Sequence, residues 1–291
     1  MNAVRLACVR YLNTAPLIEG LEKVAGVALL PAAPSAIAGM VLRSEADLGL
    51  CSIVDGARGV GEPSDGGLAL VPAGMIGCDG PTLTVRLQSA VPLARLGVLH
   101  ADVESHTSVV LAQVVLALAH GARPAIAGFD ASAGGAWPEA VLLIGDKVVT
   151  GAPPAARYPY QLDLGEAWKE LTGLPFVYAM WMCRAAEGGS ARIATAAAVL
   201  DRQRRHNATR LEWIVGRRAA AAGWPAPLAR RYLGELLRYE VGPRERAGVA
   251  RFLSEAVRLG LIAGDRTAWA DVGGDARAGV AAGAGAAPSG G

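Results

Sequence analysis

Short apolar runs alternate with helix-forming segments over the first eighty residues or so of the chain. The runs from Val4 to Val9 and from Asp47 to Cys51 have the length and apolar character of buried strands. Further strands are predicted over Val27 to Leu30 and Leu68 to Val71, and a helix is predicted from Pro34 to Arg43. This alternation indicates an α/β sheet with helices packed on its faces.

The middle of the chain carries a second block of the same kind. Strands are predicted over Thr82 to Leu87, Arg95 to Leu99 and Val141 to Ile144, and an apolar helix over Val109 to Ala119. A further strand, rich in aromatic residues, is predicted from Phe176 to Met182. We therefore expect a second α/β unit within the chain.

The β-prone segments at the two ends of the middle block indicate that one lobe is inserted into another. We expect a discontinuous first lobe of residues 1–86 plus 183–270, which includes a helical stretch from Ser190 to about Leu261, and an inserted second lobe of residues 87–182. A ligand is expected between the lobes, where pockets commonly lie. Residues 271–291 carry too little apolar bulk for a core, so a disordered tail is expected.

Composition narrows the class of protein. A content of 52% hydrophobic and 19% charged residues is typical of a globular chain, and a net charge of +2 gives no electrostatic footprint for nucleic acid. No apolar run reaches the ~18 residues of a membrane span, and Arg5 and Arg10 interrupt the region that a signal peptide needs. We expect a soluble cytoplasmic protein with no nucleic-acid or membrane partner; its oligomeric state stays open.

Several familiar kinds of site have no support in the sequence. The 4 cysteines form no Cys-x-x-Cys pair, and no histidine lies at zinc spacing from one of them. We expect them to be small buried hydrophobes, with no metal site. Neither a glycine-rich nucleotide loop nor a G-x-S-x-G elbow is present.

Polar residues lie at several predicted strand ends. Asn13 lies between the first strand and a helix that Thr14 can cap, and ligands of open α/β sheets bind at such places. Ser52 ends the third strand, and Thr82 and Thr84 follow an Asp-Gly-Pro turn. Asn13 and the threonines also have ordinary interpretations, an Asx-turn for Asn13 and plain strand positions for the threonines.

The cluster from Ser105 to Ser108 precedes the apolar helix of the middle block. The free N–H groups and partial positive charge of a helix start favour an anion, and the side chains of Ser105, His106, Thr107 and Ser108 add donors for a carboxylate or phosphate. The ordinary alternative is a Ser105 N-cap.

Gly145 and Asp146 form a further cluster at the end of a buried strand, where Asp146 could also cap the next segment. Taken together, the candidates are rich in neutral hydrogen-bond donors and poor in carboxylates. Such a set favours binding of an anionic ligand over hydrolysis by paired carboxylates.

Several motifs along the chain carry a family resemblance. They are RLACVRYLNTAPL at 5–17, Asp79-Gly80-Pro81 with its hydroxyl-bearing strand, Ser105-x-Thr107-Ser108, LLIGD at 142–146, YPYQLDLGEAWKELTGLPFVYAMW at 158–181 and YLGELLRYEVGPRERAGVARFLSEAVRLGLI at 232–262. In this order they resemble the chorismate dehydratases of the futalosine route to menaquinone. The resemblance extends over about residues 4–262.

The resemblance implies a two-lobed periplasmic-binding-protein-like fold of the second type, with mixed sheets flanked by helices. It implies loss of water from chorismate to give 3-[(1-carboxyvinyl)oxy]benzoate with no cofactor. Because no candidate side chain is an evident strong base, we expect a substrate-assisted elimination in which the enolpyruvyl carboxylate takes the proton. Asn13 and Thr84 are then the expected catalytic residues. The expected substrate-binding residues are Ser52, Thr82, Ser105, His106, Thr107, Ser108, Gly145 and Asp146.

The chain departs from the family pattern at His106, where an arginine is usual. Because an unperturbed imidazole titrates near ~6.5, we expect substrate affinity to weaken between about pH 6 and 8. Two alternative functions stay open. One is the 1,4-dihydroxy-6-naphthoate synthase of the same route, and the other is a non-catalytic binding protein for a small carboxylate, which would share the fold.

Overall fold

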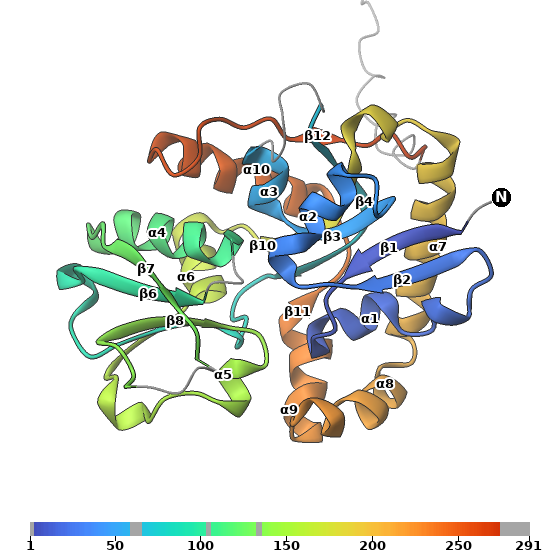
Figure 1. Ribbon diagram of the computed structural model, residues 1–291. Helices are drawn as coiled ribbons and strands as arrows, with labels where there is room; N and C mark the ends of the chain where they lie inside the picture. The colour runs from blue at the N-terminus through green and yellow to red at the C-terminus, as the bar shows by residue number, and fades with distance from the viewer. Residues whose placement is uncertain (1–2, 59–65, 103–105, 132–135, 274–291) are drawn as a thin grey trace, which may run out of the picture.

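The computed structural model of the protein describes residues 3–58, 66–102, 106–131 and 136–273. Within these residues the strands form a sheet of seven strands and a sheet of five. Figure 1 shows β6, β7 and β8 with α4, α5 and α6 on one side of the molecule, and β1 to β4 with most of the other helices on the other side. The chain therefore has a mixed, two-sheet α/β architecture, as the sequence predicts.

The larger sheet has the strand order β11-β4-β10-β3-β1-β2, and β12 pairs with β4. Its strands are β1 (Val4–Cys8), β2 (Val27–Pro31), β3 (Leu48–Ser52), β4 (Leu68–Cys78), β10 (Phe176–Arg184), β11 (Leu237–Arg238) and β12 (Ala268–Trp269). The smaller sheet has the order β7-β6-β8-β5-β9. Its strands are β5 (Val85–Ser89), β6 (Val98–Asp102), β7 (Ala125–Phe129), β8 (Ala140–Ile144) and β9 (Tyr160–Asp163).

Helices cover the faces of both sheets (Figure 1). They are α1 (Ala15–Ile18), α2 (Pro34–Leu42), α3 (Ile53–Arg58), α4 (His106–His120), α5 (Lys147–Thr150), α6 (Leu164–Thr172), α7 (Ala191–Ala208), α8 (Leu211–Arg218), α9 (Ala226–Arg231) and α10 (Pro243–Arg258). A π-helical turn, Tyr232–Leu236, follows α9. Among the described residues, none of the helices has both the length and the apolar character needed to cross a bilayer.

Strand β10 follows β9 and α6 along the chain and returns it from the smaller sheet to the larger one. It lies inside the larger sheet, antiparallel to both neighbours, with Met180 opposite Cys51 of β3 and Met75 of β4. Most of its side chains are buried and apolar, as expected for a strand in a sheet that is covered on both faces. The expected lobe limits, residues 86/87 and 182/183, stay a prediction. The expected tail, 271–291, lies outside the described residues from residue 274 onward.

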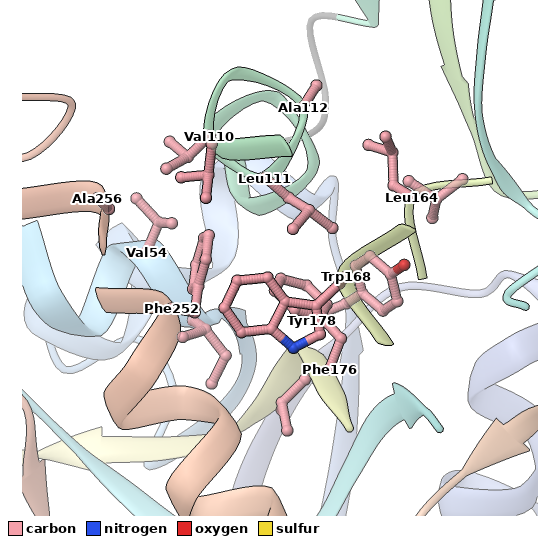
Figure 2. Packing of buried hydrophobic residues seen from close by; sticks show 14 of the residues in the cluster. Val54, Val110, Leu111, Ala112, Leu164, Trp168, Phe176, Tyr178, Phe252 and Ala256 are labelled. Carbon is pink, nitrogen blue, oxygen red and sulfur yellow. The ribbon is translucent and has the colours of Figure 1, made fainter. Parts of the chain in front are cut away.

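An aromatic cluster packs α6 against β10 and α10. Figure 2 shows the indole of Trp168 beside the rings of Phe176, Tyr178 and Phe252. The ring centroids of Trp168 and Phe176 are 5.5 Å apart and those of Phe176 and Phe252 are 4.9 Å apart, both in edge-on arrangements. Such pairs each contribute about 0.5–1.5 kcal/mol beyond the burial of their area. The indole N–H donates to the carbonyl of Pro175 at 3.2 Å, so the polar atom of this core is satisfied.

Residues at the two ends of α6 fix where the helix begins and ends. Asp163 is the N-cap, and its carboxylate accepts from the backbone N–H groups of Gly165 and Glu166. Gly173 ends the helix in the left-handed conformation, with φ of 69°, which glycine adopts without steric cost. The first turn of α6 is thereby held beside the segment that follows β4, where predicted site residues lie.

Candidate functional site

A cavity of about 110 Å³ lies where the carboxyl ends of β1 and β3 approach the first turn of α4. On a comparable measure a single water needs ~10–15 Å³, so the cavity has room for a small ligand. The sequence-predicted site residues that line it are Asn13, Ser52, Thr82, Thr84, His106, Thr107, Ser108 and Gly145. The fold therefore brings together residues that are up to 132 positions apart, from Asn13 to Gly145.

Two of the expected binding residues are not part of this lining. Ser105 lies outside the described residues. The carboxylate of Asp146 instead accepts a hydrogen bond from the indole N–H of Trp224 at 2.9 Å and another from the backbone N–H of Leu12. Burial raises the pKa of this carboxyl despite both bonds. Asp146 therefore joins the loop after β8 to the C-terminal helices and to the β1–α1 loop, and does not face the cavity.

The loop after β1 presents Asn13 to the cavity. The sequence predicted that Thr14 caps the following helix, but its side chain makes no capping hydrogen bond. Its buried hydroxyl lies 2.7 Å from the carbonyl of Tyr11 and 3.1 Å from that of Val9, which ties the loop to itself. Asn13 Oδ1 is buried and has no hydrogen-bond partner among the described residues. It is therefore an acceptor available to a ligand, and the Asx-turn interpretation finds no bond to support it.

Each of the two candidate threonines is paired with a tyrosine. The hydroxyl of Thr82 lies 2.7 Å from that of Tyr178, and the hydroxyl of Thr84 lies 2.7 Å from that of Tyr232. Burial raises the pKa of both phenols, so they stay neutral and keep their hydrogens. Sequence reasoning missed both tyrosines as site residues, although each lies within a motif of the family resemblance.

The first turn of α4 is bound to the end of β3. The backbone N–H of Thr107 donates to Ser52 Oγ at 3.0 Å, and the two hydroxyls also hydrogen-bond to each other. The N–H of Val54 points to Thr107 Oγ1 at 3.4 Å. Part of the hydrogen-bonding capacity that we expected for an anion is thus used between α4 and the larger sheet, while Ser108 is buried at the cavity wall.

His106 carries the positive charge of the site when it is protonated. Its Nδ1 lies 2.7 Å from Oδ1 of Asp55, a carboxylate that is only 2% exposed. This hydrogen bond raises the pKa of the imidazole above its ordinary value, against the opposing effects of burial and of the charge on Arg58. A protonated imidazole has two N–H donors, so one remains for a ligand when Asp55 takes the other. Sequence reasoning missed Asp55 as a partner because it lies 51 residues from His106 along the chain.

The comparisons with known proteins agree with this architecture. A chorismate dehydratase from Thermus thermophilus is 28% identical over 279 residues, which cover 90% of this chain and 97% of that protein. A crystal structure from Archaeoglobus fulgidus superposes with a TM-score of 0.60 at 15% identity, over 89% of this chain and 98% of that one. The periplasmic aliphatic sulphonate binding protein SsuA of Escherichia coli superposes with a TM-score of 0.59 at 15% identity, over 92% of each chain.

These structural likenesses establish a periplasmic-binding-protein-like fold, in agreement with the sequence prediction. The family is shown by a separate finding. A family model described as menaquinone biosynthesis matches residues 4–258, which contain every strand and helix that frames the cavity. The chain therefore belongs to the menaquinone biosynthesis family.

Proposed function

We propose that this protein is a chorismate dehydratase, which removes water from chorismate to give 3-[(1-carboxyvinyl)oxy]benzoate. The observation that carries the proposal is the composition of the cavity wall, which gathers the amide of Asn13, the paired hydroxyls of Thr82 and Thr84, and the imidazole of His106. The similarity to the chorismate dehydratase of Thermus thermophilus supports the same reaction. The activity makes the protein a carbon–oxygen lyase that needs no cofactor.

In this reaction the protein has to orient the reacting groups more than it has to supply driving force. The ring hydroxyl of chorismate leaves, the hydrogen on the adjacent ring carbon is removed as a proton, and the electrons of that C–H bond complete an aromatic ring. Aromatisation makes the reaction strongly downhill. What remains is to hold the leaving group and the proton acceptor in the geometry of elimination, which can lower a barrier by ~7–11 kcal/mol.

In this proposal, some of the cavity residues act on the leaving hydroxyl and others bind the carboxylates of the substrate. Thr84, held by the neutral phenol of Tyr232, donates to the departing hydroxyl. Asn13 orients the enolpyruvyl group through its amide N–H, and its unpartnered Oδ1 accepts from the ring hydroxyl, within the part of the site that the structure describes. Thr82 assists by binding a carboxylate oxygen.

His106 and the first turn of α4 bind a carboxylate of the substrate. The hydrogen bond that His106 Nδ1 donates to Asp55 favours the protonated imidazole, which has no lone pair left to accept a proton. The enolpyruvyl carboxylate then serves as the proton acceptor, so the elimination is substrate-assisted. The α4 start adds its partial positive charge for the carboxylate, although the Thr107 N–H is taken by Ser52.

Two measurements on the purified protein, product formation from chorismate and binding of chorismate, test the proposal and its alternatives. Incubation with chorismate should produce the absorbance of a new aromatic ring, with a product lighter by one water. Saturable binding of chorismate without any product would favour a solute-binding protein instead. Inertness toward chorismate would leave the naphthoate synthase activity as the alternative within the same route. Thr84→Val is the matched control, because valine keeps the shape of threonine and removes the hydroxyl.

A further inference from the structure

The carboxylate of Asp163 holds two segments of the chain that lie about eighty residues apart. As the N-cap of α6, its Oδ1 accepts from the N–H groups of Gly165 at 3.0 Å and Glu166 at 3.3 Å. The same carboxylate accepts from the backbone N–H of Thr82 at 2.9 Å and, through Oδ2, from that of Leu83 at 2.7 Å. Capping of α6 needs only the bonds from Gly165 and Glu166. The bonds from Thr82 and Leu83 fix the backbone between the two threonines that line the cavity.

Leu83 has a backbone conformation that a leucine rarely adopts. Its φ is 73°, in the left-handed region, where a Cβ crowds the backbone. Thr82 and Thr84, on either side of it, line the cavity, whereas Leu83 packs against the separate hydrophobic cluster around Trp224. Such a conformation persists only where its surroundings hold it. The hydrogen bond that the Leu83 N–H donates to the Asp163 carboxylate supplies that restraint.

Gly165 lets α6 come close enough for these bonds to form. A Cβ at this position would lie 2.1 Å from the hydroxyl oxygen of Thr82, 2.5 Å from the sulfur of Cys78 and 2.6 Å from the carbonyl oxygen of Gly80. The first turn of α6 therefore packs directly on Thr82. Asp163 and Gly165 form one unit, in which the glycine allows the approach and the carboxylate makes the bonds.

We propose that Asp163 is a positioning residue for the reaction: it holds Leu83 in the left-handed conformation and so aims the hydroxyls of Thr82 and Thr84 at the substrate. The inference rests on the proposed function, since it concerns the same cavity. Without the carboxylate, Leu83 relaxes toward an extended conformation, and the hydroxyl of Thr84 moves away from Tyr232. A misplacement of about 1 Å at a reacting group can cost ~10²-fold in rate.

Asp163→Ser separates this role from helix capping. Serine is itself a good N-cap and keeps a bond to the first turn of α6, but its side chain is too short to reach the N–H groups of Thr82 and Leu83. We expect kcat for chorismate to fall between ~10-fold and ~100-fold while KM changes less than about threefold. Ser190→Ala is the matched control, because Ser190 caps α7 and its loss should leave kcat unchanged.

Two further measurements make the outcome decisive. Amide hydrogen exchange at Leu83 should be faster in Asp163→Ser than in the wild type. Adding Leu83→Gly should restore part of kcat, since glycine adopts a positive φ without cost. Equal kcat in Asp163→Ser and the wild type would overturn the proposal, as would unchanged exchange at Leu83. Asp163→Asn, which sets an amide N–H against the N–H of Leu83, provides the same comparison if the serine variant does not fold.

The failure of the proposed function is distinguishable from the failure of this inference. A wild-type protein that binds chorismate or its benzoate product without turnover would refute the dehydratase assignment. Hydrogen exchange at Leu83 in Asp163→Ser then tests the positioning role without turnover. Faster exchange than in the wild type supports it, and unchanged exchange overturns it.

Discussion

The contact between His106 and Asp55 predicts how substrate affinity depends on pH. The Asp55 hydrogen bond raises the pKa of the imidazole above its ordinary value, near ~6.5, and outweighs burial and the charge on Arg58. With a raised pKa, the imidazolium is fully present below that ordinary value and is lost only as the pH rises through the folded-state value. The fall in affinity therefore lies at higher pH than the range of about 6 to 8 that the free imidazole predicts.

The size of the effect follows from the geometry of the site. A hydrogen bond to a charged group contributes about 1.5–3 kcal/mol. The His106 side chain is 34% exposed, so solvent screens its charge and we expect a loss closer to ~1 kcal/mol, or about fivefold in KM. The partial positive charge at the start of α4 and the hydroxyl of Ser108 at the cavity wall remain at high pH. Binding should weaken, but it should not disappear.

The assay is KM for chorismate measured between about pH 6 and 10 in three proteins. His106→Arg should give a flat profile, because a guanidinium stays charged throughout. Asp55→Asn should move the fall in affinity to lower pH than in the wild type, since the charge that raises the pKa of His106 is gone while burial and Arg58 still lower it. Superimposable profiles for Asp55→Asn and the wild type would refute the reasoning.

Three further substitutions test other parts of the account. Gly165→Ala should destabilise the protein by about 1–3 kcal/mol and lower kcat, because the new methyl group collides with Thr82; an unchanged melting temperature would contradict the packing at this point. Thr84→Val should lower kcat by ~10²-fold and remove one of the hydrogen bonds of the Tyr232 phenol, which also bonds to Asn13, at a cost of about 0.5–1.5 kcal/mol; a kcat equal to that of the wild type would contradict the role of Thr84. Asn13→Ala should abolish most turnover and destabilise the protein by only about 1 kcal/mol, because Asn13 Oδ1 has no partner within the described residues and the side chain gives up its hydrogen bond to Tyr232; a loss above about 3 kcal/mol in urea unfolding would count against this.

The fold was largely predictable where burial gives a clear signal. The runs that became β1, β3 and β8 are short, apolar and buried, and their pattern located them within one or two residues. Strands β7 and β9 were missed, because both lie at edges of the smaller sheet and keep much of their surface exposed, which leaves no apolar pattern to read. β10 was found as a strand but not placed, since its neighbours depend on pairing across the whole chain.

Most of the candidate residues that line the cavity were predictable from local sequence, but their hydrogen-bond partners were not. Residues such as Asn13 and Thr84 stand at strand ends and helix starts, positions that local sequence reveals. Their partners do not: Tyr232 lies 148 residues from Thr84, and Asp55 lies 51 residues from His106. Contacts at such separations arise from tertiary packing, and no local spacing encodes them.

The central claim is tested most directly by counting turnovers of chorismate. Purified protein is mixed with a large molar excess of chorismate, and the product is quantified over time by its aromatic proton resonances and its mass. We predict many molecules of 3-[(1-carboxyvinyl)oxy]benzoate per molecule of protein, with the yield strongly reduced in Thr84→Val. Chorismate that binds to the protein and is recovered unchanged would contradict the account.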